Sequence, residues 1–172
     1  LLTPPDGLSE EVRNFFTIRH SWAWTKGQAW FGDGRDKWPW LDHYPQNAGW
    51  HESPDNPEQI SVSVAQHPVG TIGRSYSNGT QPPPERCRPA EGIYFSEQWK
   101  RALEVAPPFV MITGWNEWIA QRFIDPAGRM TMAGRKLQPG DSYFVDQYSE
   151  EFSRDIEPMK GGFDDAYYYQ MV

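Results

Sequence analysis

The sequence predicts an α/β fold with parallel strands, and more specifically the C-terminal part of a (β/α)₈ barrel of the TIM type with long βα loops. The expected elements follow the order strand, long loop, strand, long loop and helix, strand, loop and helix. Residues 109–115, FVMITGW, are apolar on both faces, as is typical of a parallel strand covered on both sides. Three strands are too few for a closed barrel of about eight. We therefore expect residues 1–172 to be a single domain, a fragment of a larger glycosidase-like barrel; a small complete α/β domain is the alternative.

The N-terminal half is expected to contain one short helix and two strands. Residues 8–14 predict the helix, with Ser9 as its N-cap. Residues 15–24, FFTIRHSWAW, predict a strand that becomes polar at its C-terminal end, and a loop rich in Gly, Pro, Asp and Trp follows over residues 25–59. Residues 60–68, ISVSVAQHP, predict the second strand, because β-branched residues alternate and a proline ends the run.

The C-terminal half is expected to alternate loops with helices around the third strand. A loop with three consecutive prolines spans residues 69–94. Residues 96–106 predict a helix, because Ser96 can cap it and apolar residues recur at helical spacing. After the strand at 109–115, a glycine-rich loop (124–140) leads to a predicted helix over 142–157, and residues 165–172 predict a last helix.

Composition excludes some classes of protein. The formal net charge is −7 and no Lys/Arg cluster stands out, so we expect no nucleic-acid partner. No apolar run approaches the roughly 20 residues that span a membrane. Cys87 is the single cysteine, which excludes an intrachain disulfide. No signal peptide is visible, and the chain begins with Leu1 rather than Met, as expected of a fragment.

Aromatic residues make up 15 % of the chain, and nine of them are Trp. One interpretation is a Trp-rich core. The other is that several rings line a sugar-binding cleft, because their faces suit the C–H faces of sugars.

The three predicted strands end in IRHSWAW, VAQHP and GWNEW, each of which changes from apolar to polar residues. Parallel strands bring such ends to one rim, where the active site of a barrel lies. We therefore predict that Glu117 is the catalytic carboxylate, since partial desolvation between indoles raises the pKa of a carboxyl group. The alternative is that Glu117 only pairs with an arginine such as Arg122 or Arg19. The predicted substrate-binding residues are Arg19, His20, Trp22, Trp24, Gln66, His67, Trp115, Asn116, Trp118, Gln121 and Arg122.

No metal or other cofactor is predicted. His20 and His67 lack the short helical spacing of a zinc site, and the aspartates of residues 31–45 do not match a calcium loop. Asp146, Asp155 and Glu157 are expected on the charged face of the predicted helix at 142–157 or in pairing at its end.

The segment ITGWNEW resembles the strand-end motif of the glycoside hydrolase family 99-like barrels, which include endo-acting mannosidases. The stretches DKWPWLDHYPQ (36–46), FSRDIEPMKGG (152–162) and DDAYYYQMV (164–172) resemble parts of an uncharacterised bacterial group of secreted glycosidase-like proteins related to those barrels. The resemblance implies a (β/α)₈ fold, a carbohydrate substrate, no required redox cofactor and an extracytoplasmic location.

The chain departs from that family motif at one position. The motif has a second Glu three residues after the first, and here that position is Ala120. A partner carboxylate must then come from elsewhere, with Asp42, Glu52, Asp146 or residues upstream of Leu1 as candidates, or the protein only binds glycans. Gln121 and Arg122 could replace substrate contacts but not the proton transfer. The sequence thus predicts a glycoside hydrolase-like protein, with a non-catalytic glycan-binding barrel and an unrelated Trp-rich α/β domain as alternatives.

Overall fold

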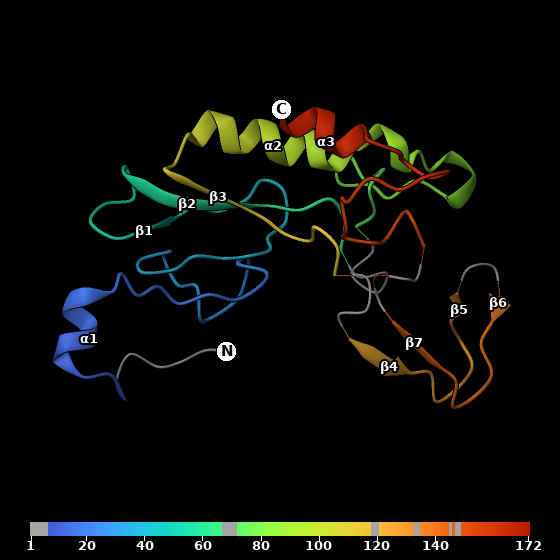
Figure 1. Ribbon diagram of the computed structural model, residues 1–172, viewed down its shortest axis with the longest axis horizontal. Helices are drawn as coiled ribbons and strands as arrows, with labels where there is room; N and C mark the ends of the chain where they lie inside the picture. The colour runs from blue at the N-terminus through green and yellow to red at the C-terminus, as the bar shows by residue number, and fades with distance from the viewer. Residues whose placement is uncertain (1–6, 67–71, 118–120, 133–134, 145, 147–148) are drawn as a thin grey trace. The chain divides into compact units, whose positions relative to one another are not determined.

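The structure, a computed structural model, describes residues 7–66, 72–117, 121–132, 135–144, 146 and 149–172 (Figure 1). The chain divides into two compact units. The first comprises Leu1–Val62 and Gln98–Ile112, and the second comprises Ser63–Glu97 and Thr113–Val172. We describe each unit by itself.

The first unit is built on a three-stranded sheet of order β1-β2-β3 (Figure 1). β1 (Gly49–Trp50) pairs antiparallel with β2 (Pro57–Val62), and β2 pairs in parallel with β3 (Phe109–Ile112). The inner strand carries the core, because Ile60 and Val62 are fully buried. β3 is an edge strand, and its first three residues are exposed.

Two helices belong wholly or partly to the first unit. α1 (Glu10–Phe15) starts where the sequence predicts, and the Val12 N–H donates to the Ser9 Oγ at 3.3 Å. α2 (Ile93–Val105) begins in the second unit and ends in the first, where Ala102 is buried. It ends just before Pro107 and Pro108, as expected from the loss of backbone donors there.

The second unit contains two small antiparallel sheets and a short C-terminal helix. β4 (Arg122–Ile124) pairs with β7 (Ser142–Phe144), and β5 (Thr131–Met132) pairs with β6 (Arg135–Lys136). Two short 3₁₀ turns, η2 (Pro84–Arg86) and η3 (Pro89–Glu91), precede α2, and α3 (Ala166–Met171) lies at the C-terminus. The core of the second unit is aromatic and contains the buried side chains of Tyr94, Phe95, Phe163 and Tyr167.

The prediction of a (β/α)₈ barrel fragment is wrong. Among the described strands β2 and β3 are the one parallel pair, every other pair is antiparallel, and no closed parallel arrangement forms. Two sequence segments account for the error. Residues 15–24 form no strand: Phe15 ends α1, and His20 and Ala23 form only isolated parallel bridges with Lys37 and Leu41 of the following loop.

The second segment is the predicted helix at 142–157. Its first residues form β7, which pairs with β4, and its last residues form no helix and donate hydrogen bonds to the segment after β3. Apolar residues from Phe144 to Ile156 recur at helical spacing. The backbone groups of this segment are nevertheless satisfied by hydrogen bonds to β4 and to the residues after β3. The helix predicted for 165–172 is confirmed in substance as α3.

A buried carboxylate, that of Asp42, orders the loop between α1 and β2. Asp42 accepts hydrogen bonds from the N–H groups of Thr25 (3.1 Å), His43 (2.8 Å) and Asn47 (2.8 Å), and from the Thr25 hydroxyl. Asp42 is 1 % exposed, so these bonds replace its water. Asp42 is therefore a structural residue and does not supply the partner carboxylate considered above.

Candidate functional site

The candidate site in the second unit is the segment that follows β3. Trp115, Asn116 and Glu117 are all exposed, and Trp115 shows 46 % of its surface to solvent. Gly114, just before them, has a positive φ of 78°, and a Cβ there would overlap the carbonyl oxygen of Arg154. The site segment therefore needs glycine at this position, both for its backbone conformation and for its close approach to residues 154–157.

Residues 155–157 fix the backbone of this segment through hydrogen bonds. The Ile156 N–H lies 3.2 Å from the carbonyl oxygens of both Gly114 and Trp115, and the Glu157 N–H donates to the Trp115 carbonyl at 2.8 Å. The Glu117 N–H donates to Oδ1 of Asp155 at 2.5 Å. The side chain of Glu117 is thus exposed, while its backbone is fixed by a hydrogen bond to the buried Asp155.

Beneath the segment lies a buried ionic network. Arg154 donates through Nε and Nη2 to the two carboxylate oxygens of Asp146, at 2.9 and 2.7 Å. Arg74 is fully buried, donates through Nη2 to the Asp155 carbonyl, and lies 4.3 and 4.6 Å from the ring centres of Phe163 and Tyr167. This network stabilises the shape of residues 153–157, on which Glu117 depends.

Burial and charge shift the pKa values of two groups in this network. Asp155 is fully buried, and its pKa is raised to about 6, first because burial disfavours its charged form and next because of the neighbouring Asp146. The hydrogen bond to Asp146 holds the pKa of Arg154 above its usual range. Asp146, predicted as a possible partner carboxylate, is 2 % exposed and already occupied by Arg154.

Glu157 is the other carboxylate at the surface of this segment. Glu157 is half-buried, and the hydrogen bond from its N–H to the Trp115 carbonyl places it in the segment that lies next to Glu117. We call Trp115, Asn116, Glu117 and Glu157 the Glu117 strip. The sequence predicts Glu157 on the charged face of a helix or in pairing at its end, and only the hydrogen bonds between residues 155–157 and the segment after β3 reveal its position.

The remaining predicted residues of the second unit lie in different environments. Gln121 and Arg122 are exposed at the start of β4. Gln66 is fully buried, and its Nε2 lies 3.4 Å from the Tyr94 hydroxyl. His67, Trp118 and Ala120 lie outside the described residues.

In the first unit, Arg19 is held by a carboxylate that the sequence did not indicate. Its Nε and Nη2 donate to Oε2 and Oε1 of Glu58 at 2.5 and 2.6 Å, and the Trp38 indole donates to the same carboxylate at 3.0 Å. Arg19 lowers the pKa of Glu58 mainly through this hydrogen bond. Since Arg19 is engaged here, it does not pair with Glu117, and Glu117 forms no ion pair with any described residue.

The other predicted contacts of the first unit are aromatic or half-buried. Trp22 is 45 % exposed and meets Trp40 edge to face, with ring centres 6.5 Å apart. Trp24 is half-buried, with a positive φ of 54°, and His20 is half-buried against the edge of Trp30. These residues lie in one unit and the Glu117 strip lies in the other.

An open groove of about 360 Å³ lies beside β3 in the first unit. It is lined mainly by aromatic and apolar side chains, with few polar groups. Its lining includes Arg19, Ser21, Trp38, Trp40, Phe109, Val110 and Met111. Sequence reasoning selected Arg19 but missed Trp38 and Trp40, whose only sequence signal is the WPW run.

Other classes of site are not indicated. Within the described ranges, no three His, Cys, Asp or Glu side chains are grouped so that they could hold a metal ion. Of the helices that the structure describes, none has the length and apolar character needed to cross a membrane. In comparisons with known proteins, no family model, curated protein or solved structure matches the chain.

Proposed function

We propose that the chain is a carbohydrate-active protein that hydrolyses glycosidic bonds, with Glu117 as the carboxylate that acts on the bond. One observation carries the proposal. Glu117 is exposed beside an exposed indole, while its own backbone is fixed by a buried carboxylate at 2.5 Å. Catalytic carboxylates need this combination of access and fixed geometry, and an aromatic face next to them suits a sugar ring. The resemblance of GWNEW to the family 99-like strand-end motif supports a carbohydrate substrate.

We further propose Glu157 as the second carboxylate. Hydrolysis of a glycoside needs two carboxyl groups, about 5–5.5 Å apart in retaining enzymes and about 6.5–9.5 Å apart in inverting ones. Glu117 and Glu157 extend from two hydrogen-bonded segments that meet at the Trp115 carbonyl. Asp155 is fully buried and cannot reach a substrate without rearrangement, so its role is to position Glu117.

The first test is a screen of the protein against a panel of polysaccharides and glycans, measuring both the release of reducing sugar and binding. If the protein hydrolyses glycosidic bonds, it should release reducing sugar from at least one member of the panel. Binding of a glycan without release of reducing sugar would favour the second candidate, a non-catalytic glycan-binding protein. Neither binding nor release across mannans, glucans, xylans and N-glycans would reject both candidates.

The leaving group separates the roles of the two carboxylates. If Glu157 protonates the departing oxygen, Glu157→Gln should lose much less activity on an aryl glycoside with a good leaving group than on the natural glycan. Glu117→Gln should be impaired on both substrates. Equal losses for Glu157→Gln on both would remove Glu157 from the role of general acid. Glu104→Gln, an exposed change on α2, is the matched control.

A non-catalytic glycan-binding protein is the second candidate. The aromatic groove beside β3 favours it, because indoles with a few polar groups bind sugars without needing a pair of carboxylates. Trp40→Ala should then abolish glycan binding while Glu117→Gln leaves it unchanged.

A further inference from the structure

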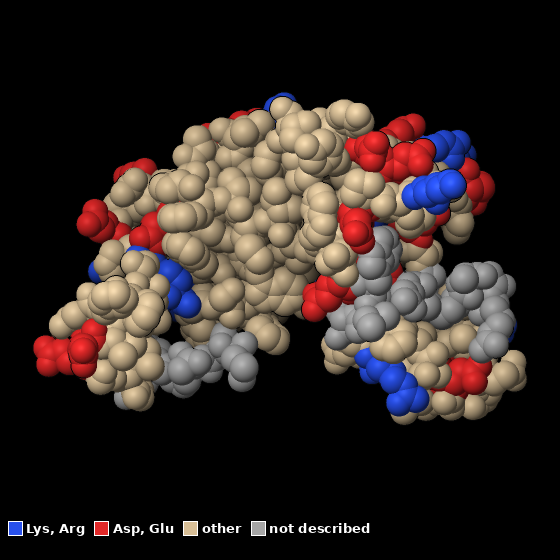
Figure 2. All heavy atoms as spheres, viewed as in Figure 1, with Lys and Arg blue, Asp and Glu red and all other residues tan. Residues whose placement is uncertain are grey.

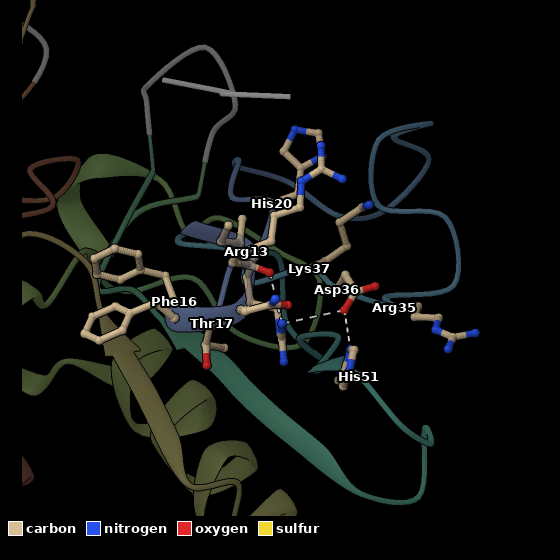
Figure 3. A pocket seen from close by; sticks show the side chains of 12 residues that line it. Arg13, Phe16, Thr17, His20, Arg35, Asp36, Lys37 and His51 are labelled. Carbon is tan, nitrogen blue, oxygen red and sulfur yellow. Dashed lines mark hydrogen bonds and ion pairs between the residues drawn. The ribbon is translucent and has the colours of Figure 1, made fainter. Parts of the chain in front are cut away.

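A second, larger groove lies in the first unit, between the end of α1 and the loop before β2 (Figure 3). Its volume is about 750 Å³. Its charged lining residues are Arg13, Arg19, Arg35, Lys37 and Asp36, and two histidines, His20 and His51, also border it. Positive charge therefore gathers in this groove although the whole chain has a net charge of −7.

Backbone pairing between three segments builds the groove. The His20 N–H donates to the Asp36 carbonyl at 2.8 Å, and the Trp38 N–H donates to the His20 carbonyl at 2.9 Å. The Asp36 N–H in turn donates to the Trp50 carbonyl at 2.7 Å. Lys37 and His20 thus lie on paired backbone, whereas Arg13 lies on α1.

The charges in the groove fall into two groups. Arg19 is neutralised by Glu58 and lies 3.7 Å from Asp36, which also holds His51 at 2.5 Å. Arg13 and Lys37, by contrast, form no ion pair with a carboxylate of any described residue. Figure 3 shows that the side chains of Arg13, His20 and Lys37 extend to the same side of the groove, whereas Arg35 points away.

The wall of the groove next to Arg13 is aromatic. Phe15 and Phe16 are 80 % and 59 % exposed and pack edge to face, with ring centres 4.9 Å apart. These two exposed rings and the two cations line the same groove, which suits a ligand with an anionic end and an apolar body.

We propose that this groove binds an organic monoester of phosphate or sulfate, whose oxyanion lies between Arg13 and Lys37 and whose organic part lies against Phe16. The Lys37 ammonium and the Arg13 guanidinium supply charge-assisted hydrogen bonds to the anion. The site is distinct from the Glu117 strip and does not depend on the hydrolysis proposed above.

Titration calorimetry at low ionic strength tests the proposal with three probes: phenyl phosphate, phenyl sulfate and inorganic phosphate. We expect one phenyl ester to bind, more weakly as salt is added, and the tighter ester identifies the anion. Replacing both cations (Arg13→Gln with Lys37→Gln) should weaken that binding roughly tenfold or more. Lys100→Gln, which removes an exposed charge on α2 outside the groove, should not.

Phe16→Ala tests the position of the organic part, because it should weaken the binding of the phenyl ester but not of inorganic phosphate. Melting temperatures confirm that each variant is folded. The proposal is overturned if neither ester binds at low salt, or if the double variant binds as tightly as Lys100→Gln. Equal weakening of both probes by Phe16→Ala would overturn the aromatic contact.

Discussion

At the scale of single residues, Asp155 is the side chain on which the candidate site depends. It is fully buried, accepts the Glu117 N–H, and has a pKa raised to about 6 by burial and by Asp146. A raised pKa means that the native state holds this proton more tightly than the unfolded chain does. The charged form of Asp155 therefore lowers the stability of the fold. The same side chain fixes the backbone of Glu117 through its hydrogen bond.

Because the pKa of Asp155 is raised in the folded state, its contribution to stability decreases as the pH increases. Since the unfolded-state pKa of an aspartate is about 3.9, the contribution of Asp155 to stability should fall as the pH rises from about 4 to about 6, and stay constant above. Asp155→Asn mimics the protonated group. We expect this variant to match the wild type near pH 4 and to be on the order of 2 kcal/mol more stable at pH 7.

Urea unfolding of both proteins at several pH values measures that difference, in which the contributions of other groups cancel. A difference that does not change between pH 4 and 7 would show that Asp155 does not titrate there. If the variant is also active, its pH profile reports whether the charge of Asp155 affects Glu117.

Asp42 illustrates the opposite case, a buried carboxylate whose bonds stabilise the fold. It accepts from the N–H groups of Thr25, His43 and Asn47. Asp42→Ala leaves these donors unpaired in the interior and should cost on the order of 3 kcal/mol of unfolding free energy. Asp33→Ala, which removes one exposed bond to the Arg35 N–H, should cost less than about 1 kcal/mol. Similar losses in the two variants would contradict this role for Asp42.

At the scale of elements, local signals predict some segments and fail for others. The N-cap serine Ser9 and the paired prolines predict the start of α1 and the end of α2, because these signals act within a few residues. Other expected bounds are wrong: α2 begins at Ile93 and has no cap at Ser96, β2 is Pro57–Val62 in place of 60–68, and β3 ends at Ile112 in place of residue 115. Residues 15–24 and 142–157 depend on backbone partners elsewhere in the chain, which no local pattern contains.

The same limit applies to the candidate site. Glu117, Trp115 and Asn116 are visible in the sequence because they follow an apolar strand. The pairing of Arg19 with Glu58 joins residues 39 apart, and that of Glu117 with Asp155 joins residues 38 apart. Such partners become apparent only in the fold, and the helical spacing of residues 142–157 pointed away from Asp155 and Glu157.

The edge strand β3 leads to a prediction about association. Phe109, Val110 and Met111 are exposed, and β3 has one strand partner among the described residues. An apolar edge of this kind pairs readily with other chains. We expect concentration-dependent self-association that Met111→Lys reduces without lowering the melting temperature. Leu103→Lys on α2, which removes an apolar group that is still more exposed (64 % against 48 % for Met111) and lies away from the edge, is the control for sedimentation measurements. Equal effects of the two changes would exclude edge pairing.

At the scale of the whole molecule, the net charge is −7, and the absence of a nucleic-acid partner stays a prediction. On the face drawn in Figure 2, the basic side chains near α1 lie beside acidic ones, and the described residues form no broad basic area. The acidic side chains at α1 include Glu10 and Glu11 of its first turn. The anionic ligand proposed above is a small one, whose binding needs the two cations Arg13 and Lys37 rather than an extended basic patch.

The central claim is that Glu117 carries the chemistry of this protein. The measurement that tests it most directly is the turnover of wild type and of Glu117→Gln on the glycan that the screen identifies, with melting temperatures alongside. Loss of a catalytic carboxylate should reduce the rate on the order of 10²–10⁴-fold, with little change in melting temperature, because the side chain is exposed. Glu104→Gln should retain wild-type turnover. Near wild-type turnover in Glu117→Gln, or a rate that falls only as the protein unfolds, would contradict the claim.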